Sequence, residues 1–145
     1  MQTQTVNLDE AEIMYGAFKN VDGSGSITTG YALAFTTTAA SLNGHNAVLP
    51  ATGQVLTFAG VAAEDVAINA SGRYIAYGYA ASVRIEAVGS SVTVAVGIAM
   101  GPTAAKVGVN STGSRDTNGP VVAMQAIGAA ILSPGGWAKG FVRAM

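Results

Sequence analysis

The feature that most constrains the fold is a strict alternation of apolar and other residues in the middle of the chain. In SVRIEAV, residues 82–88, an apolar side chain occupies every second position, and SVTVAVGI, residues 91–98, repeats the pattern. Successive side chains of a β-strand point to opposite faces, so a period of two predicts strands with one buried face. A short turn containing Gly89 and Ser90 separates the two segments. We therefore expect a hairpin in which 82–88 pairs with 91–98.

Other segments rich in β-branched and aromatic residues, bounded by Gly, Pro, Asn or Ser, predict further strands. These segments are 27–35, 55–62, 73–79, 105–109 and 137–145. In the closing segment, alternation places Trp137, Lys139, Phe141 and Arg143 on one side. Polar stretches rich in turn-forming residues separate the strands, and they predict loops at 41–53, 63–72 and 110–120.

Two segments admit a helix as well as a strand. Residues 8–19 carry acidic residues near the start and Lys19 at the end, the polarity that a helix dipole favours. The overlapping segment 13–21 also reads as a strand leading into a turn, and we favour the strand. Residues 121–132 lack charge and their alanines tolerate a helix, while their valines and central glycine favour one or two buried strands.

About eight short strands separated by turn signals predict an all-β fold, a single compact barrel or sandwich. The polar residues 1–7 show no periodic pattern, so we expect a short N-terminal arm there and a single β domain over 8–145. A chain of 145 residues is long enough for one domain with its own core.

The composition points to a surface that other protein covers. Only 10% of the residues are charged and 50% are hydrophobic, whereas soluble domains carry roughly 25% charged residues. Few charges remain to solvate the surface, so we expect much of it to be buried against partners. The net charge of −1 and the lack of a basic run argue against nucleic-acid binding. No apolar run reaches the roughly 18 residues of a membrane-spanning helix, so no membrane partner is expected.

The segment NVDGSGSITTGY, Asn20–Tyr31, is similar to a calcium-binding loop at its start. Asn20, Asp22 and Ser24 fall at the first three ligand positions of the twelve-residue pattern, but Tyr31 stands where a bidentate Glu is needed. The loop holds one carboxylate, and a β-like segment follows it in place of a helix. We predict a glycine-rich turn entering a strand, with no bound metal or cofactor.

Catalytic chemistry has little support in the sequence. His45 is the single histidine and lies in the loop LNGHNA, without a serine or carboxylate at a telling spacing. Glu64 and Asp65 are adjacent and are expected to point in different directions as solvated caps. Arg84 and Glu86 share one strand face, where we expect cross-strand pairing. No catalytic residue is assigned, and the protein is not expected to be an enzyme.

The tyrosines of the central strand admit a second interpretation. Tyr77 and Tyr79 share a face, as in a sugar-stacking platform, and Tyr74 is nearby. Packing in the core or between subunits explains them more simply, because amide and acidic partners for a sugar are missing around them.

A pattern of glycine-spaced strands extends over most of residues 18–145. Its segments are FKNVDGSGSITTGYALAF, FAGVAAEDVAINASGRYIAYGYAASVRI, VTVAVGIAMGP, PVVAMQAIGAAI and KGFVRAM. In this order the segments resemble the small head decoration (cement) proteins of tailed bacteriophages. The resemblance implies a structural virion protein, assembled in the host cytoplasm, that binds the exterior of an icosahedral capsid. It further implies a homotrimer that clamps neighbouring subunits of the major capsid protein.

The polar N-terminus is the segment from which we expect capsid or subunit contacts. An extended peptide with free backbone donors and acceptors can pair with an exposed sheet edge. We therefore expect an added strand formed by Met1, Gln2, Thr3, Gln4, Thr5 and Val6; a frayed terminus without a role is the alternative. The alternative function is a secreted β-sandwich module that binds carbohydrate or calcium. An esterase-like enzyme is a third alternative with less support in the sequence.

Overall fold

The computed structural model describes residues 12–36, 45–50, 57–88, 93–103, 106–110, 119–128 and 135–144. These residues form nine strands and no helix, which confirms the predicted all-β fold. The strands are β1 (Met14–Asn20), β2 (Ala32–Phe35), β3 (Asn46–Val48), β4 (Phe58–Ala62), β5 (Ser71–Val88), β6 (Ala99–Thr103), β7 (Lys106–Asn110), β8 (Val121–Ala123) and β9 (Gly136–Arg143).

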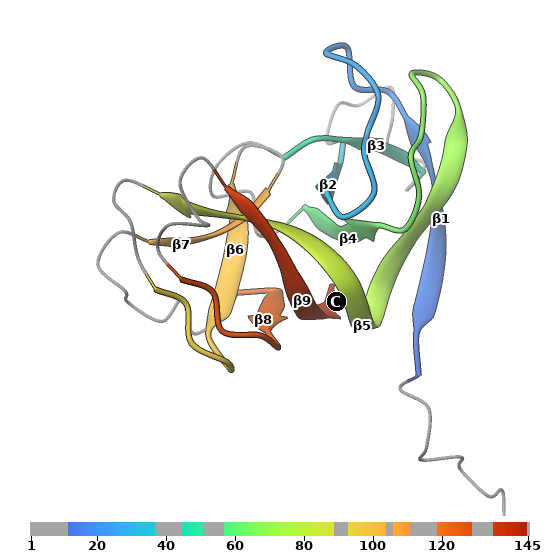
Figure 1. Cartoon of the computed structure of the whole chain (residues 1–145). Coiled ribbons are helices and arrows are strands. Elements are labelled where there is room, and N and C mark those ends of the chain that lie inside the picture. The colour runs from blue at the N-terminus through green and yellow to red at the C-terminus, as the bar shows by residue number, and fades with distance from the viewer. Residues whose placement is uncertain are drawn as a thin grey trace, which may run out of the picture.

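The strands close into two rings that share β5, which runs between two lobes in Figure 1. In the first lobe the neighbours are β1-β3-β2-β4-β5, and β5 pairs back onto β1. In the second lobe they are β5-β7-β6-β8-β9, and β9 pairs back onto β5. Each ring has one parallel pair, β1–β3 or β5–β7, and its other pairs are antiparallel. The second ring therefore has the same connectivity as the first.

The backbone hydrogen bonds of the two lobes agree pair by pair. Ile27 and Val66 exchange two bonds of 2.9 and 2.8 Å, and Val94 and Ile127 exchange two of 2.9 and 2.8 Å. Three further equivalent bonds are Gly30 N to Ala62 O with Gly97 N to Ala123 O, Ala62 N to Tyr31 O with Ala123 N to Ile98 O, and Ala63 N to Arg73 O with Met124 N to Lys139 O. The chain is thus an internal repeat of one five-stranded ring.

Strand β5 serves both lobes because it bends between them (Figure 1). Its register against β9 shifts between Ala80 and Val83. Near this bend Gly78 has φ of 112°, and a Cβ there would lie 2.4 Å from the carbonyl oxygen of Glu12. Only glycine fits such a backbone at this close approach. The predicted strands 73–79 and 82–88 are therefore two halves of one strand.

Two buried clusters fill the lobes. The interior of the first lobe is formed by Phe18, Ile27, Leu33, Ala47, Ala59, Ala62 and Val66. The larger cluster combines the interior of the second lobe with four first-lobe residues, Ala32, Phe58, Val61 and Ile75. Ala32 and Leu33 are consecutive in β2 and belong to different clusters, so β2 has both faces buried. The outer face of β2 and β4 is therefore packed against the second lobe.

The predicted hairpin of 82–88 with 91–98 is wrong. Residues 82–88 lie in β5 and pair with β7 and β9. In the second segment Val94 forms an isolated bridge with Ile127, and the backbone turns at Gly97, whose φ is 85°. The alternating valines do not share one buried face: Val94 is buried at the bridge, whereas Val96 lies in the turn and is 60% exposed. The period of two in this segment therefore does not indicate a regular strand.

Several other predictions can be compared with the structure. β1 is a strand, as favoured, and β9 alternates buried and exposed residues with Trp137 and Lys139 on the exposed side. The ambiguous segment 121–132 begins with the short strand β8. The predicted loop 41–53 contains β3, because Ala47 is buried and pairs with both β1 and β2. Residues 63–70 form bends and a turn around Val66, as predicted for the loop 63–72, and its last two residues begin β5.

Candidate functional site

The turn that follows β1 is held by Asn20 and Asp22. Asn20 is fully buried, and its side-chain amide donates to the carbonyls of Gly25 at 3.1 Å and Val66 at 3.0 Å, while its Oδ1 accepts from Asp22 N at 2.9 Å. Asp22 Oδ1 accepts from the amide of Ser24 at 2.8 Å and from its hydroxyl, and Asp22 Oδ2 accepts from Leu49 N at 2.8 Å. Both carboxylate oxygens are therefore used by the protein.

These contacts also set the acidity of Asp22. Burial on its own raises the pKa of this carboxyl, but the hydrogen bonds from Ser24 and Leu49 outweigh it and lower the pKa below the usual value. The loop leads to β2, a strand, in agreement with the predicted turn. Among the described residues no group of three or more His, Asp or Glu side chains could hold a metal ion. That the loop binds no calcium stays a prediction, which calorimetric titration with calcium tests.

The adjacent carboxylates Glu64 and Asp65 have different partners. Glu64 Oε1 accepts from Arg73 N at 2.8 Å and forms an ion pair with its Nε at 3.4 Å. Asp65 Oδ1 accepts from Thr29 N at 2.7 Å and from the Thr29 hydroxyl at 2.8 Å, and these bonds lower the pKa of Asp65. Each side chain fixes a local segment, so the two do not face one reaction centre. His45 is exposed, and its carbonyl accepts from Lys19 N at 2.7 Å.

The strand tyrosines pack against other rings of the chain. Tyr74 lies edge-on to Phe18, with centroids 6.2 Å apart, and to Phe35, at 6.0 Å, and burial raises its pKa. Tyr77 lies edge-on to Phe141 with centroids 5.1 Å apart. Tyr79 is half-buried. Core packing therefore accounts for Tyr74, and intrachain aromatic contacts account for Tyr77.

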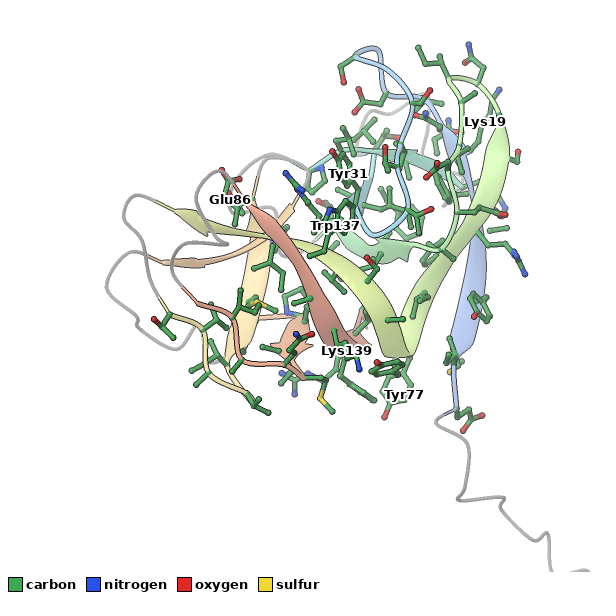
Figure 2. All side chains as sticks on the ribbon, viewed as in Figure 1. Lys19, Tyr31, Tyr77, Glu86, Trp137 and Lys139 are labelled. Carbon is green, nitrogen blue, oxygen red and sulfur yellow. The ribbon has the colours of Figure 1, made fainter. Side chains whose placement is uncertain are left out.

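An aromatic clamp joins the two lobes; we use this name for Gly30, Tyr31, Arg84 and Trp137. Tyr31 stacks on Trp137 with centroids 6.1 Å apart and an interplanar angle of 23°, and the Arg84 guanidinium lies 5.2 Å from the Trp137 ring centre. Arg84 N donates to Gly30 O at 2.8 Å. Figure 2 shows Tyr31, from the first lobe, beside Trp137, from β9.

Glycine is required at the centre of the clamp. Gly30 has φ of 83°, and a Cβ there would lie 2.5 Å from the Trp137 ring and 2.9 Å from Ser82 O. The turn at Gly30 is thus pressed directly onto the second lobe. Sequence reasoning missed the clamp, because its residues lie far apart in the chain and only the turn at Gly30 had a local signal.

Large apolar side chains remain exposed on both lobes of the described structure. They are Met14 (56%), Tyr15 (53%), Ile68 (47%), Val96 (60%), Met124 (46%) and Trp137 (44%). Met14 also lines an apolar hollow of about 340 Å³ with Ala76, Tyr77 and Ala144. A second hollow, of about 240 Å³, lies at the junction of the lobes. These surfaces are the candidate sites of contact with other protein.

The contact residues predicted at the N-terminus, Met1 to Val6, lie outside the described residues, so that prediction stays untested. In the part of the chain that the structure describes, no helix is long and apolar enough to cross a membrane. No protein-family model matches the sequence, and the search of curated proteins finds no match.

Proposed function

We propose that the protein is a structural virion component that binds the exterior of an icosahedral bacteriophage capsid and stabilises it. Its partners are the major capsid protein and further copies of itself, in a trimer. The proposal begins from the resemblance of the glycine-spaced strands to phage head decoration proteins. It places the protein on the capsid surface after assembly in the host cytoplasm.

The exposed apolar side chains of both lobes are the observation that carries this proposal. Met14 and Tyr15 lie on the first lobe, and Val96 and Met124 on the second, each at least 46% exposed. With 10% charged residues, the chain has few charges on its surface to keep a protein with such apolar patches soluble. Association with other protein removes these patches from water, and this favours a protein that works while covered.

The two-lobed architecture supports a clamping role. The lobes are held together by a shared strand, by a common apolar cluster and by the aromatic clamp. One chain therefore presents two surfaces at a fixed separation, as a protein that bridges neighbouring capsid subunits requires. The alternative, a module binding carbohydrate or calcium, has weaker support, since Asp22 and Tyr77 already have partners within the chain.

Binding to empty capsids tests the proposal. The purified chain is mixed with expanded capsids that lack decoration, the capsids are pelleted, and the bound protein is counted per capsid. We expect saturable binding and a higher capsid melting temperature. A chain that stays in the supernatant at all concentrations, with the melting temperature unchanged, contradicts the proposed function.

Truncation of the arm tests the predicted contact residues. A chain lacking residues 1–6 should fold normally, because these residues precede β1, but it should bind capsids or other copies more weakly. The matched control replaces residues 1–6 by a Gly/Ser sequence of equal length, which keeps the length but loses the Gln and Thr side chains. Equal capsid stabilisation by the truncated and full chains means that the contacts come from the lobes.

A further inference from the structure

The contact between the lobes shows how one repeat docks on the next. The first lobe presents the turn 28–31, and the second lobe receives it on Arg84 and Trp137. At the side of this contact, the hollow of about 240 Å³ is lined by small residues and by Ile13, Tyr15, Ile75 and Tyr79. The small residues relevant to the comparison between lobes are Thr29 and Ala63 of the first lobe, and Ala81 and Ser82 of the β5 half that belongs to the second lobe.

The second lobe has the same docking turn with nothing described against it. Residues 95–98 match 28–31: Ile98 N donates to Ala95 O as Tyr31 N does to Thr28 O, and Gly97 has φ of 85°. A Cβ on Gly97 would meet no described atom within 4 Å, whereas one on Gly30 would overlap the Trp137 ring. The turn that docks in the first lobe is therefore open in the described part of the second, where Val96 is 60% exposed.

The first lobe has the matching receiving face. The position of Arg84 in β5 is held in the first lobe by Ala17 of β1, which pairs with Arg73 as Arg84 pairs with Trp137. The bond from Ala63 N aligns Arg73 with Lys139 instead, two residues from Trp137, so the two receiving faces match on β1 and differ in register on the partner strand. Arg73 lies 5.6 Å from the ring centre of Tyr15, a contact of the same kind as that between Arg84 and Trp137, although Tyr15 stands at the position of Ser82. Tyr15 is 53% exposed and the Arg73 side chain 64% exposed.

A backbone donor also points outward on this face. Asn20 N donates to Ala70 O across the β1–β5 pair, and the amides of a strand alternate between its two sides. The amide of Ala17 therefore points away from β5, as that of Lys19 does towards His45 O. It occupies the position from which Arg84 N donates to Gly30 O in the second lobe.

Most of the exposed large apolar residues lie at positions that correspond to the contact between the lobes. Four small residues at the hollow between the lobes, Thr29, Ala63, Ala81 and Ser82, correspond along the repeat to Val96, Met124, Met14 and Tyr15, and Tyr15 also lines the edge of this hollow. These four are large, apolar and exposed, whereas their counterparts are small. Four of the six exposed large apolar side chains thus lie on the open turn or on the open receiving face.

We infer that copies of this chain associate head to tail, with the second-lobe turn 95–98 of one copy on the first-lobe receiving face of the next. Val96 and Met124 pack against Met14 and Tyr15, and the Ala17 amide donates to the carbonyl of Gly97. The contact is heterologous, so it closes into a ring or continues as an open chain. This contact would join the subunits of the proposed trimer. The inference does not depend on capsid binding, because the contact forms between copies of the chain alone.

Sedimentation of the full chain without capsids tests the contact. We expect the wild type to associate, and Val96→Asp to raise the apparent Kd by roughly 30-fold or more, since a charge then replaces a central apolar group. Ala17→Pro removes only the outward amide of β1, at a position where the strand pairs with β5 and not with β3, and should have a comparable effect while the circular dichroism spectrum is unchanged. If Ala17→Pro unfolds, Ala17→Arg is used instead, because the exposed Ala17 tolerates a long side chain.

The matched control is Ile68→Asp, which alters an exposed apolar residue of a turn outside the contact and should leave association unchanged.

Mixing the two variants distinguishes a head-to-tail contact from a symmetric one. Val96→Asp keeps an intact receiving face and Ala17→Pro keeps an intact turn, so an equimolar mixture should form dimers while each variant alone is monomeric. A wild type that is monomeric at all concentrations, a mixture that stays monomeric, or equal weakening by Ile68→Asp overturns the inference. Association without capsid binding contradicts the proposed function alone, and capsid binding by a monomeric chain contradicts this inference alone.

Discussion

The two lobes build the same ring with different local chemistry. In the first lobe the turns are held by buried Asn20 and by the carboxylates Asp22 and Asp65. At the corresponding positions the second lobe has Ala87, Gly89 and Ala126. The reciprocal bonds between Ile27 and Val66 and between Val94 and Ile127 nevertheless have the same lengths. Ring closure therefore depends on backbone pairing and apolar filling, and the side chains of Asn20, Asp22 and Asp65 add stability to the first lobe.

The largest effect is expected from adding a Cβ at the docked turn. Gly30→Ala strains a left-handed backbone, at a cost of about 1–2 kcal/mol, and forces apart Trp137 and Ser82 O, which adds about 1–3 kcal/mol. Gly97→Ala has the same backbone strain, and its Cβ would meet none of the described atoms within 4 Å. Urea unfolding at concentrations that keep the chain monomeric should show the greater loss for Gly30→Ala. Equal losses mean that the clamp does not hold the lobes together.

The second-largest effect is expected from removing Asn20, whose hydrogen bonds hold the turn of the first lobe and have no counterpart at Ala87 of the second. Asn20→Ala removes three hydrogen bonds and leaves the buried Val66 carbonyl without its side-chain donor, so we expect a loss of about 2–3 kcal/mol. Hydrogen exchange should rise most at the amides of Ile27 and Val66 and least at those of Val94 and Ile127. The matched control is Asp22→Asn, which keeps an acceptor in the turn and should cost less. A uniform rise across both lobes means that the first turn supports the whole molecule.

Local patterns in the sequence predicted the elements but could not predict how they pair. The alternation in β9 and the turn at Gly25 depend on near neighbours, so they could be read directly. The repeat could not, because 18–33 and 85–100 align without a gap but share few identical residues beyond the turn glycine and the following alanine. Apolar character is kept at the ring interior, where Leu33 corresponds to Met100, while the polar groups differ.

The clamp and the open contact were unpredictable for a different reason. Tyr31 and Trp137 meet only because the two rings share β5, so no spacing in the sequence connects them. Val96 and Tyr15 look like ordinary strand residues until the contact between the lobes shows that their counterparts, Thr29 and Ser82, lie at a docked turn and at the face that receives it. Low charge predicted that a covered surface exists, and the repeat indicates which residues form it.

The smallest predicted effect is a dependence on pH that belongs to the first lobe. Hydrogen bonds from Ser24 and Leu49 hold the pKa of Asp22 below its unfolded value of 3.8, so the charged form is favoured in the folded state. This stabilisation is complete above the unfolded pKa and is lost as the pH falls through the folded pKa. Because Asp22 is largely solvated, we expect the free energy of unfolding to fall by less than about 1 kcal/mol between pH 6 and pH 2 from this group.

Urea unfolding across this range should show a smaller loss of stability in acid for Asp22→Asn than for the wild type. Hydrogen exchange in acid should increase at Ile27 before Val94, because the second lobe has Gly89 in place of Asp22. An equal acid response of the two lobes would place the titrating groups elsewhere and remove the polar turn as the source of the difference.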